Sequence, residues 1–285
     1  MGGQSKKSVN QSKLGRLQHE LRPGLLATTA WLGKRGYSRQ LLDHYVSAGW
    51  LESMAHGVYR RPGSPLKWQH VVGSLQNLLE LPVHVGGLSA LEFQGYGHFA
   101  RMSGIMTVHL YALAPLPAWL DKLPLKDKFV IHRGRLFDEE GRGLTSAAVD
   151  VARDAAQHTG PLRVGMKEIV WGEYDWPITY STAERAMLEF LSEVPRTETI
   201  GHANLLMQGL RNLSPRRLTQ LLAQCRSIKV KRLFFALAEH NHQPWLKELD
   251  KSKIDFGKGK RALTPGGKLH PEYLITLPHN IDDSV

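Results

Sequence analysis

Apolar positions between residues 12 and 63 change from helical to strand spacing as the chain advances. A first helix is predicted by three leucines at helical spacing, Leu14, Leu17 and Leu21. A second helix is predicted by a further apolar group, Leu25, Leu26, Ala30 and Leu32. Gly33 and Gly36 follow within four residues, which favours a sharp turn over a continued helix.

The segment after this turn predicts a two-sided helix over residues 39–47. Ser38 is the expected N-cap, because its hydroxyl can accept a hydrogen bond from the first helical turn. Gly49 is placed to end the helix. The apolar side of the helix consists of Leu41, Leu42, Tyr45 and Val46. The other side carries side chains that can form hydrogen bonds with base edges.

A β-hairpin is expected next, with strands at residues 50–54 and 58–61 and a turn between them. Two helices joined by a tight turn and followed by a hairpin make a winged helix-turn-helix, which places its second helix in the major groove of DNA. We expect the hairpin to bring basic side chains to the phosphate backbone. The predicted DNA-binding residues are Lys34, Arg35, Ser38, Arg39, Gln40, Asp43, His44, Ser47, His56, Arg60 and Arg61.

The rest of the chain predicts a mixed region followed by helices. Strand-like and helical segments alternate over about residues 83–180, helical patterns dominate residues 181–250, and a tail follows at 251–285. We therefore predict an α+β protein with two domains, a winged helix-turn-helix at 1–63 and a C-terminal domain at 64–285 that is first mixed α/β and then mainly helical.

Charge is concentrated at the N-terminus. Residues 1–63 contain ten lysines and arginines against three acids, so this segment carries +7 of the chain's net +11. Such an asymmetry indicates a polyanionic partner and supports DNA binding. A solvated basic face on a small protein-binding domain is the alternative.

A second basic stretch lies between residues 211 and 232 and contains no acid. It is either a solvated polar face or a second contact surface for nucleic acid or an acidic protein. Its members are Arg211, Arg216, Arg217, Arg226, Lys229, Lys231 and Arg232.

We find no catalytic constellation, metal site or cofactor motif in the sequence. Gly73-Ser74 lacks the following carboxylates that a nucleotidyltransferase needs to hold Mg²⁺. The single cysteine, Cys225, excludes an internal disulfide and a cysteine-based zinc cluster, and its apolar neighbours predict a buried thiol. No apolar run reaches the length of a membrane span, and we expect a cytoplasmic protein without a membrane partner.

Several short motifs, in their order and spacing, resemble AbiEi-type antitoxins, the regulator halves of AbiE abortive-infection (type IV toxin–antitoxin) systems. The resemblance extends from about residue 14 to residue 278. The motifs are Gly49-Trp50-Leu51, Gly57-Val58-Tyr59, the segment Gly86-Gly87-Leu88-Ser89-Ala90-Leu91-Glu92 with Gly95 after it, Lys229-Val230-Lys231-Arg232-Leu233, and Asp255-Phe256-Gly257-Lys258-Gly259-Lys260-Arg261.

The resemblance implies a winged-helix domain that binds inverted repeats in the promoter of its own operon. It also implies a C-terminal domain that opposes a nucleotidyltransferase-like toxin encoded alongside. The predicted partners are thus double-stranded DNA and, directly or functionally, that toxin.

Three alternatives follow from the residues. The chain could be a nucleic-acid-modifying enzyme that a winged-helix domain targets, although the carboxylates for this were not found. It could be a regulator without an antitoxin role, or a scaffold that binds a protein through residues 211–232.

Overall fold

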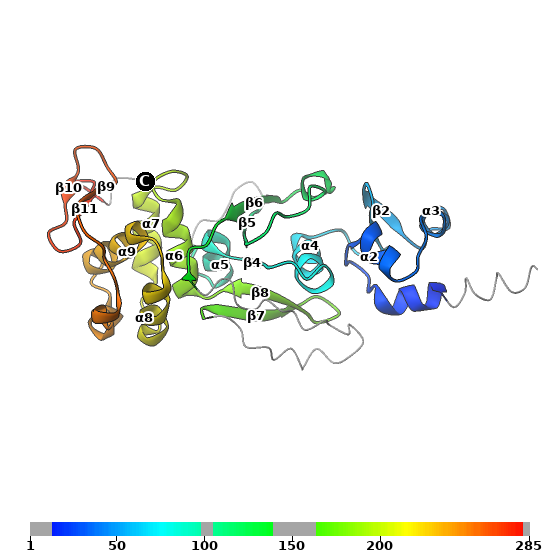
Figure 1. Cartoon of the computed structure of the whole chain (residues 1–285), viewed down its shortest axis with the longest axis horizontal. Helices are drawn as coiled ribbons and strands as arrows, with labels where there is room; N and C mark the ends of the chain where they lie inside the picture. Colours follow the sequence, from blue (N-terminus) through cyan, green and yellow to red (C-terminus); the bar gives the residue numbers. More distant parts are fainter. Residues whose placement is uncertain (1–12, 98–104, 139–163, 282–285) are drawn as a thin grey trace, which may run out of the picture.

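The computed structural model describes residues 13–97, 105–138 and 164–281. Its helices and strands confirm the predicted α+β class. Along the long axis of the molecule, an N-terminal helix-and-hairpin unit is followed by a five-stranded sheet and then by a helical C-terminal part (Figure 1). Residues 1–12, which open the basic N-terminal segment, lie outside the described residues.

The N-terminal unit contains a helix over residues 13–20 and a small three-stranded sheet of order β1-β3-β2. Its other elements are β1 (Ala27–Thr28), α2 (Thr29–Lys34), α3 (Arg39–Ser47), β2 (Glu52–Ala55) and β3 (Val58–Arg60). Strand β1 was not predicted: Ala27 and Thr28 pair with Tyr59 and Val58, and the helix begins only at Thr29. The Thr28 hydroxyl accepts a hydrogen bond from the Trp31 N–H at 3.2 Å, which fixes that start.

The middle of the molecule is a mixed sheet of order β6-β5-β4-β8-β7. Its strands are β4 (Val83–Val85), β5 (Thr107–Ala112), β6 (Lys128–Arg133), β7 (Met166–Trp171) and β8 (Trp176–Ser181). Strand β5 alternates strictly between buried and half-buried residues. Val108, Leu110 and Ala112 share an apolar core with helix α4 (Trp68–Gly73), which continues as the π-helical turn η1 (Ser74–Leu78). The opposite side of β5 contacts α5 (Gly87–Phe93), where Ser89 Oγ donates to the Thr107 carbonyl oxygen at 3.0 Å.

The C-terminal part packs four helices around one apolar core. They are α6 (Ala183–Glu193), α7 (Ile200–Gly209), α8 (Pro215–Gln224) and α9 (Ile228–His240). The short helices η4 (Pro244–Glu248) and η5 (Lys251–Lys253) lead to a small sheet of order β10-β11-β9. Its strands are β9 (Arg261–Ala262), β10 (Lys268–Leu269) and β11 (Ile275–Leu277). Cys225 is buried in this core, as its apolar neighbours indicate.

Apolar contacts are continuous between the N-terminal unit and the sheet. Leu26 and Val58 belong to the core that contains α4, while Leu78 and Trp176 belong to the core of the N-terminal unit. The Leu26 N–H also donates to Ser74 Oγ at 2.7 Å. The domain boundary after residue 63 stays a prediction. In the described ranges, no helix combines the length and apolar character needed to cross a membrane.

Candidate nucleic-acid interface

Helix α3 has the two sides that its sequence predicts. Ser38 caps it, since the hydroxyl accepts a hydrogen bond from the Leu41 N–H at 3.3 Å. The helix ends before Gly49, whose φ of +74° favours glycine. Leu42 and Tyr45 are buried against the neighbouring helices.

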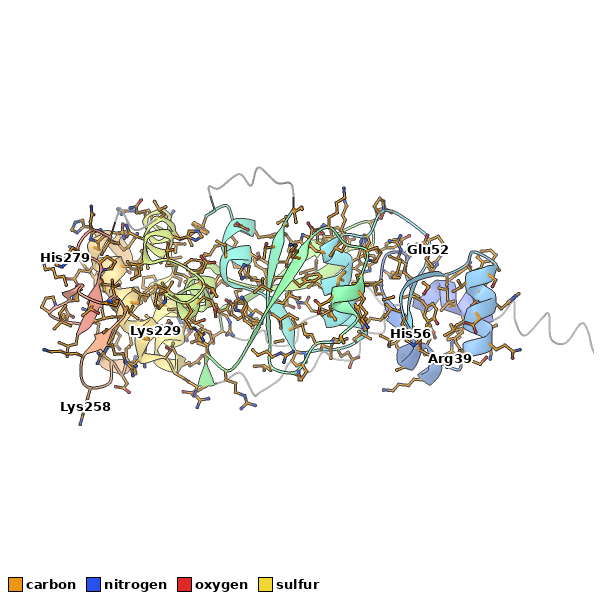
Figure 2. All side chains as sticks on the ribbon, turned by 90° about the horizontal axis from the view of Figure 1, so that it is seen from above. Arg39, Glu52, His56, Lys229, Lys258 and His279 are labelled. Carbon is orange, nitrogen blue, oxygen red and sulfur yellow. The ribbon has the colours of Figure 1, made fainter. Side chains whose placement is uncertain are left out.

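The polar side of α3 faces solvent at one end of the molecule. Arg39 and His56 project from this end (Figure 2). Of the predicted contact residues, Lys34, Ser38, Arg39, Gln40, Asp43, His44, Ser47 and His56 are exposed. The Ser47 hydroxyl donates to the Asp43 carbonyl oxygen at 2.9 Å, so its proton is used within the helix. The side chains of Arg39 and Gln40 have no such partner within the described chain.

Arg35 lies beside this surface and is half-buried. Its guanidinium carbon lies 3.6 Å from the centre of the Trp31 ring, within the range of a cation–π contact. The Nε also lies 3.9 Å from a Glu20 carboxylate oxygen. Arg35 is therefore partly held by the protein, unlike Arg39.

The two arginines of the hairpin do not reach outward as predicted. Arg60 is only 8% exposed, because its Nε donates to the Glu52 carboxylate at 2.7 Å and another nitrogen donates to the Ser64 carbonyl oxygen at 3.0 Å. Arg61 donates to the carbonyl oxygens of Gln18 and Leu21, at 2.8 and 3.3 Å. Arg61 therefore caps the C-terminal end of the helix over residues 13–20. Both arginines thus donate to internal acceptors instead of projecting outward as predicted.

Trp50 lies next to this surface and was not among the predicted contact residues. It follows α3 directly and is 46% exposed, the largest apolar side chain to be so exposed in the N-terminal unit. The backbone N–H of Trp50 donates to the Tyr45 carbonyl oxygen at 2.9 Å, which fixes the backbone where α3 ends.

The second predicted basic surface, residues 211–232, does not form. Lys231 and Arg232 are 3% and 1% exposed, and Lys229 donates to the carbonyl oxygens of Ser192 and Val194. Arg217 forms an ion pair with Glu184 at 2.9 Å. The exposed members are Arg211, Arg216 and Arg226.

Two of these exposed arginines also have partners in the protein. Arg226 is 3.3 Å from the Asp138 carboxylate, and Arg211 donates to the Asn241 carbonyl oxygen at 3.3 Å. Helix α9 is buried along most of its length, so positions 231 and 232 face the interior despite their charge.

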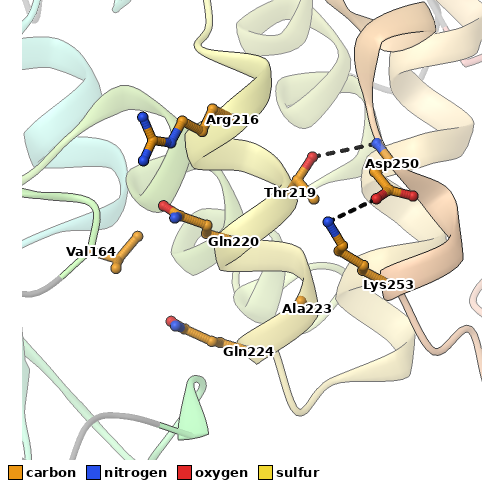
Figure 3. A pocket seen from close by; sticks show the side chains of 8 residues that line it. All are labelled: Val164, Arg216, Thr219, Gln220, Ala223, Gln224, Asp250 and Lys253. Carbon is orange, nitrogen blue, oxygen red and sulfur yellow. Dashed lines mark hydrogen bonds and ion pairs between the residues drawn. The ribbon is translucent and has the colours of Figure 1, made fainter.

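Arg216 reaches a shallow hollow of about 660 Å³ on helix α8 (Figure 3). The hollow is lined by Val164, Arg216, Thr219, Gln220, Ala223, Gln224, Asp250 and Lys253. Lys253 pairs with the Asp250 carboxylate at 3.0 Å, and the Asp250 N–H donates to Thr219 Oγ1 at 3.4 Å. The charges on one side of the hollow thus neutralise each other, and Arg216 is left on the other side.

A buried ionic cluster joins the central sheet to α5 and α6. Glu189, 1% exposed, accepts hydrogen bonds from Ser181 Oγ and Arg185 Nε at 2.8 Å and from the Gly87 N–H at 3.0 Å. The Glu189 carboxylate also lies 2.9 Å from His84 Nε2. Burial opposes ionisation of this carboxyl, but the charge and hydrogen bond of His84, and then Arg185, hold the pKa of Glu189 well below its ordinary value.

This cluster explains the paired glycines of the motif at 86–92. A Cβ atom at Gly86 would lie 2.3 Å from a Glu189 carboxylate oxygen, and one at Gly87 would lie 2.6 Å from the Tyr111 hydroxyl. Gly87 also has a φ of +51°. The cluster is therefore a structural connection that any larger residue at these two positions would disrupt. In the ranges that the structure covers, no three His, Cys, Asp or Glu side chains gather as a metal site.

Comparison with known proteins identifies the family. Residues 106–278 match the family described as "Transcriptional regulator, AbiEi antitoxin, Type IV TA system", and residues 10–102 match "Transcriptional regulator, AbiEi antitoxin N-terminal domain". No curated protein matches the chain.

A solved structure supports the fold. The crystal structure of the RV2827C protein from Mycobacterium tuberculosis aligns with a TM-score of 0.51 at 15% sequence identity, covering 94% of this chain and 90% of that one. At this identity the likeness concerns the fold alone. The two family matches together cover nearly the whole chain, and they confirm the resemblance found in the sequence motifs. The chain belongs to the AbiEi antitoxin family of transcriptional regulators of type IV toxin–antitoxin systems.

Proposed function

We propose that the exposed side of α3 enters the major groove of DNA and reads base edges in the promoter of the chain's own operon. The observation that carries this proposal is the set of exposed hydrogen-bonding side chains on α3, of which Arg39 and Gln40 have no partner within the described chain. Arginine suits guanine and glutamine suits adenine, because each can form two hydrogen bonds with the major-groove edge of that base.

The contact surface that we propose differs from the one that the sequence predicts. Lys34 and His56 supply phosphate contacts beside α3, while Arg60 and Arg61 hold the hairpin in place. Phosphate contacts position the protein, and the residues on α3 specify the sequence. The result is repression of the operon by its own product, which acts in the cytoplasm.

The C-terminal part, residues 64–285, carries the antitoxin role in this proposal. It opposes a nucleotidyltransferase-like toxin encoded in the same operon and does so by binding, without a cofactor and without catalysis. The family assignment supports the role, and the sequence supports the absence of chemistry because the paired carboxylates of a nucleotidyltransferase were not found.

Promoter binding by matched pairs of variants tests the DNA-binding proposal. We expect Arg39→Ala with Gln40→Ala to weaken binding of the full chain to its own promoter by about thirtyfold or more, since two base contacts of about 1–3 kcal/mol each are lost. The control is Arg216→Ala with Gln220→Ala, which removes the same two side-chain types from α8 and should change affinity less than about twofold. Equal losses in both pairs would overturn the assignment of α3.

A separate assay tests the absence of catalysis. The purified chain is incubated with Mg²⁺, nucleoside triphosphates and transfer RNA, and nucleotide incorporation is followed. We expect no turnover above that of heat-denatured protein. Turnover that co-purifies with the chain through two chromatographic steps would contradict the proposal.

A further inference from the structure

A second cationic surface lies at the opposite end of the molecule from α3. The segment after η5 forms a glycine-rich loop that leads into β9, at the edge of the small C-terminal sheet. Lys258 extends from this end, while Arg39 lies at the other (Figure 2). The two surfaces are therefore separated by the central sheet and the helical part.

The buried Arg232 holds this loop from inside. It donates to the carbonyl oxygens of Phe256 at 2.8 Å, Gly259 at 2.6 Å and Leu274 at 3.2 Å. Gly257 and Gly259 have φ values of +63° and +76°, which allow the chain to turn its carbonyls inward. The loop is thus held in shape by a charged group that is 1% exposed.

The inward carbonyls leave the charged side chains of the loop facing solvent, while Phe256 packs against the C-terminal core. Its cations are Lys258, Lys260 and Arg261, and Lys268 lies across the same small sheet; all four are exposed. None of the four forms an ion pair or a side-chain hydrogen bond within the described residues. The nearby Lys251 and Lys253 differ, because they pair with Glu272 at 2.8 Å and with Asp250 at 3.0 Å.

The one acidic side chain within the loop forms no ion pair with these cations. Asp255 turns back on its own backbone, where its carboxylate accepts a hydrogen bond from the Gly257 N–H at 2.7 Å. The loop therefore presents three unpaired positive charges within four residues, and Lys268 adds a fourth from β10.

The surroundings of the four cations favour phosphate over protein as the partner. Among the described residues, the exposed large apolar side chains are Trp50, Phe93, Ile105, Met106, Val130, Val170 and Leu205, and none follows Leu205 in the chain. Protein interfaces bury an apolar, often aromatic centre and are depleted in lysine. Nucleic-acid backbones are bound by lysine and arginine without such a centre.

We propose that Lys258, Lys260, Arg261 and Lys268 form a second nucleic-acid-binding surface that contacts the phosphate backbone independently of α3. The phosphates are those of RNA or of DNA, which share this chemistry. Binding without base contacts is insensitive to sequence and weakens steeply with salt. The surface would let one molecule hold its promoter at one end and a second strand at the other.

Lysine footprinting on the full chain locates this contact directly. The protein is acetylated with and without a mixed-sequence single-stranded RNA of about twenty nucleotides, or a DNA duplex of similar length without promoter sequence, and each lysine is quantified by mass spectrometry. We expect Lys258 and Lys260 to be protected at least about threefold by one or both probes, and the better probe distinguishes RNA from DNA. Lys122 and Lys126 are exposed lysines of the central region and serve as internal controls.

Protection of Lys34 is measured in the same sample, so failure at α3 and failure at the C-terminal surface are separate results. Protection at Lys34 without protection at Lys258 and Lys260 would overturn the proposal. Protection of Lys258 and Lys260 by polyglutamate but by neither nucleic acid would also overturn it and would indicate an acidic protein instead.

A charge-removing variant gives a second measurement. Lys258→Gln, Lys260→Gln and Arg261→Gln together should weaken binding of the better probe by about tenfold at low salt, since three phosphate contacts are lost. The control removes three exposed lysines from the central region, Lys122→Gln, Lys126→Gln and Lys128→Gln, and should weaken it less than about twofold. Equal losses in both triple variants would show only a general charge effect and would contradict the proposal.

Discussion

Two stretches of this chain are comparably basic and serve opposite purposes. The segment around α3 exposes Lys34 and Arg39 to solvent. The stretch 211–232 has seven cations and no acid, yet its last two members, Lys231 and Arg232, are buried. Positive charge in the sequence therefore indicates a contact surface only where the fold leaves the side chain without an internal acceptor.

The difference arises from how each helix packs. Helix α3 buries one side, and its charged residues occupy the other. Helix α9 is surrounded by the C-terminal core, so every residue from Val230 to Ala238 is buried. Arg232 lies on a side that meets three backbone carbonyls, and charge-assisted hydrogen bonds to these carbonyls compensate for its lost hydration.

The largest expected effect is the loss of stability when the buried cation Arg232 is replaced. Arg232→Met should lower the free energy of unfolding by about 3–5 kcal/mol, because three inward carbonyls lose their donor. Urea unfolding measures the loss. Promoter affinity should not change at temperatures where the variant is folded. The exposed Arg216→Met is the control and should stay within about 0.5 kcal/mol of the wild type; similar losses in both variants would contradict the contrast.

Arg60 should give the next largest effect, again on stability. Arg60→Met should cost about 2 kcal/mol, since the ion pair with Glu52 and the hydrogen bond to Ser64 are both lost. The salt dependence of promoter binding should remain that of the wild type. His56→Gln, at the exposed hairpin tip, should leave stability unchanged. An Arg60→Met variant with normal stability and uniformly weaker DNA binding would place Arg60 at the phosphate backbone after all.

His70 is a buried side chain whose charge, unlike that of an arginine, depends on the pH. Burial, and then the positive charges of Arg60 and Lys67, lower the pKa of His70 from 6.5 to about 4. The neutral ring therefore contributes stability that is present above pH 6.5 and is lost as the pH falls from 6.5 towards 4. Between pH 8 and pH 5, the loss is on the order of 1–2 kcal/mol.

Comparison with His70→Asn isolates this contribution. Asparagine can still accept the hydrogen bond that the Lys67 N–H donates to His70 Nδ1 at 3.0 Å, but it does not titrate. Urea unfolding at pH 8 and pH 5 should show a smaller loss for the variant than for the wild type. Equal losses would mean that other groups account for the pH dependence.

The smallest expected effect is at Lys34, which touches only the backbone of the DNA in our account. Lys34→Gln should leave base preference and stability unchanged and should lower the log–log salt slope of binding by about 0.9, the contribution of one phosphate contact. Fluorescence anisotropy at several salt concentrations measures the slope. An unchanged slope would remove Lys34 from the interface.

Local patterns predicted a large part of the fold. Ser38 and Gly49 bound α3 as expected, and Ser38 Oγ accepts from the Leu41 N–H at 3.3 Å. These features depend on residues within one helical turn of each other. Strand β1 could not be predicted in this way, because the sequence of Ala27 and Thr28 continues the apolar pattern of the helix that follows. The two residues are extended because they pair with β3.

The parts of the site that were mispredicted depend on distant partners. Arg61 is held by the carbonyls of Gln18 and Leu21, some 40 residues earlier in the chain. Glu189 meets His84 and Gly87 only because the sheet and α6 come together, and no spacing in the sequence signals this contact. To predict whether a cation is exposed to solvent, one must know which acceptors surround it in the folded protein. The sequence pattern does not contain this information.

The most direct test of the account is the base preference that Arg39 confers. Affinities of the wild-type chain and of Arg39→Ala are measured against a series of promoter duplexes, each with one base pair of the half-site replaced. We predict that the variant loses discrimination at a single guanine-containing base pair, by about 1–3 kcal/mol, and keeps it elsewhere. A variant that binds every duplex more weakly but ranks them as the wild type does would contradict base recognition by α3.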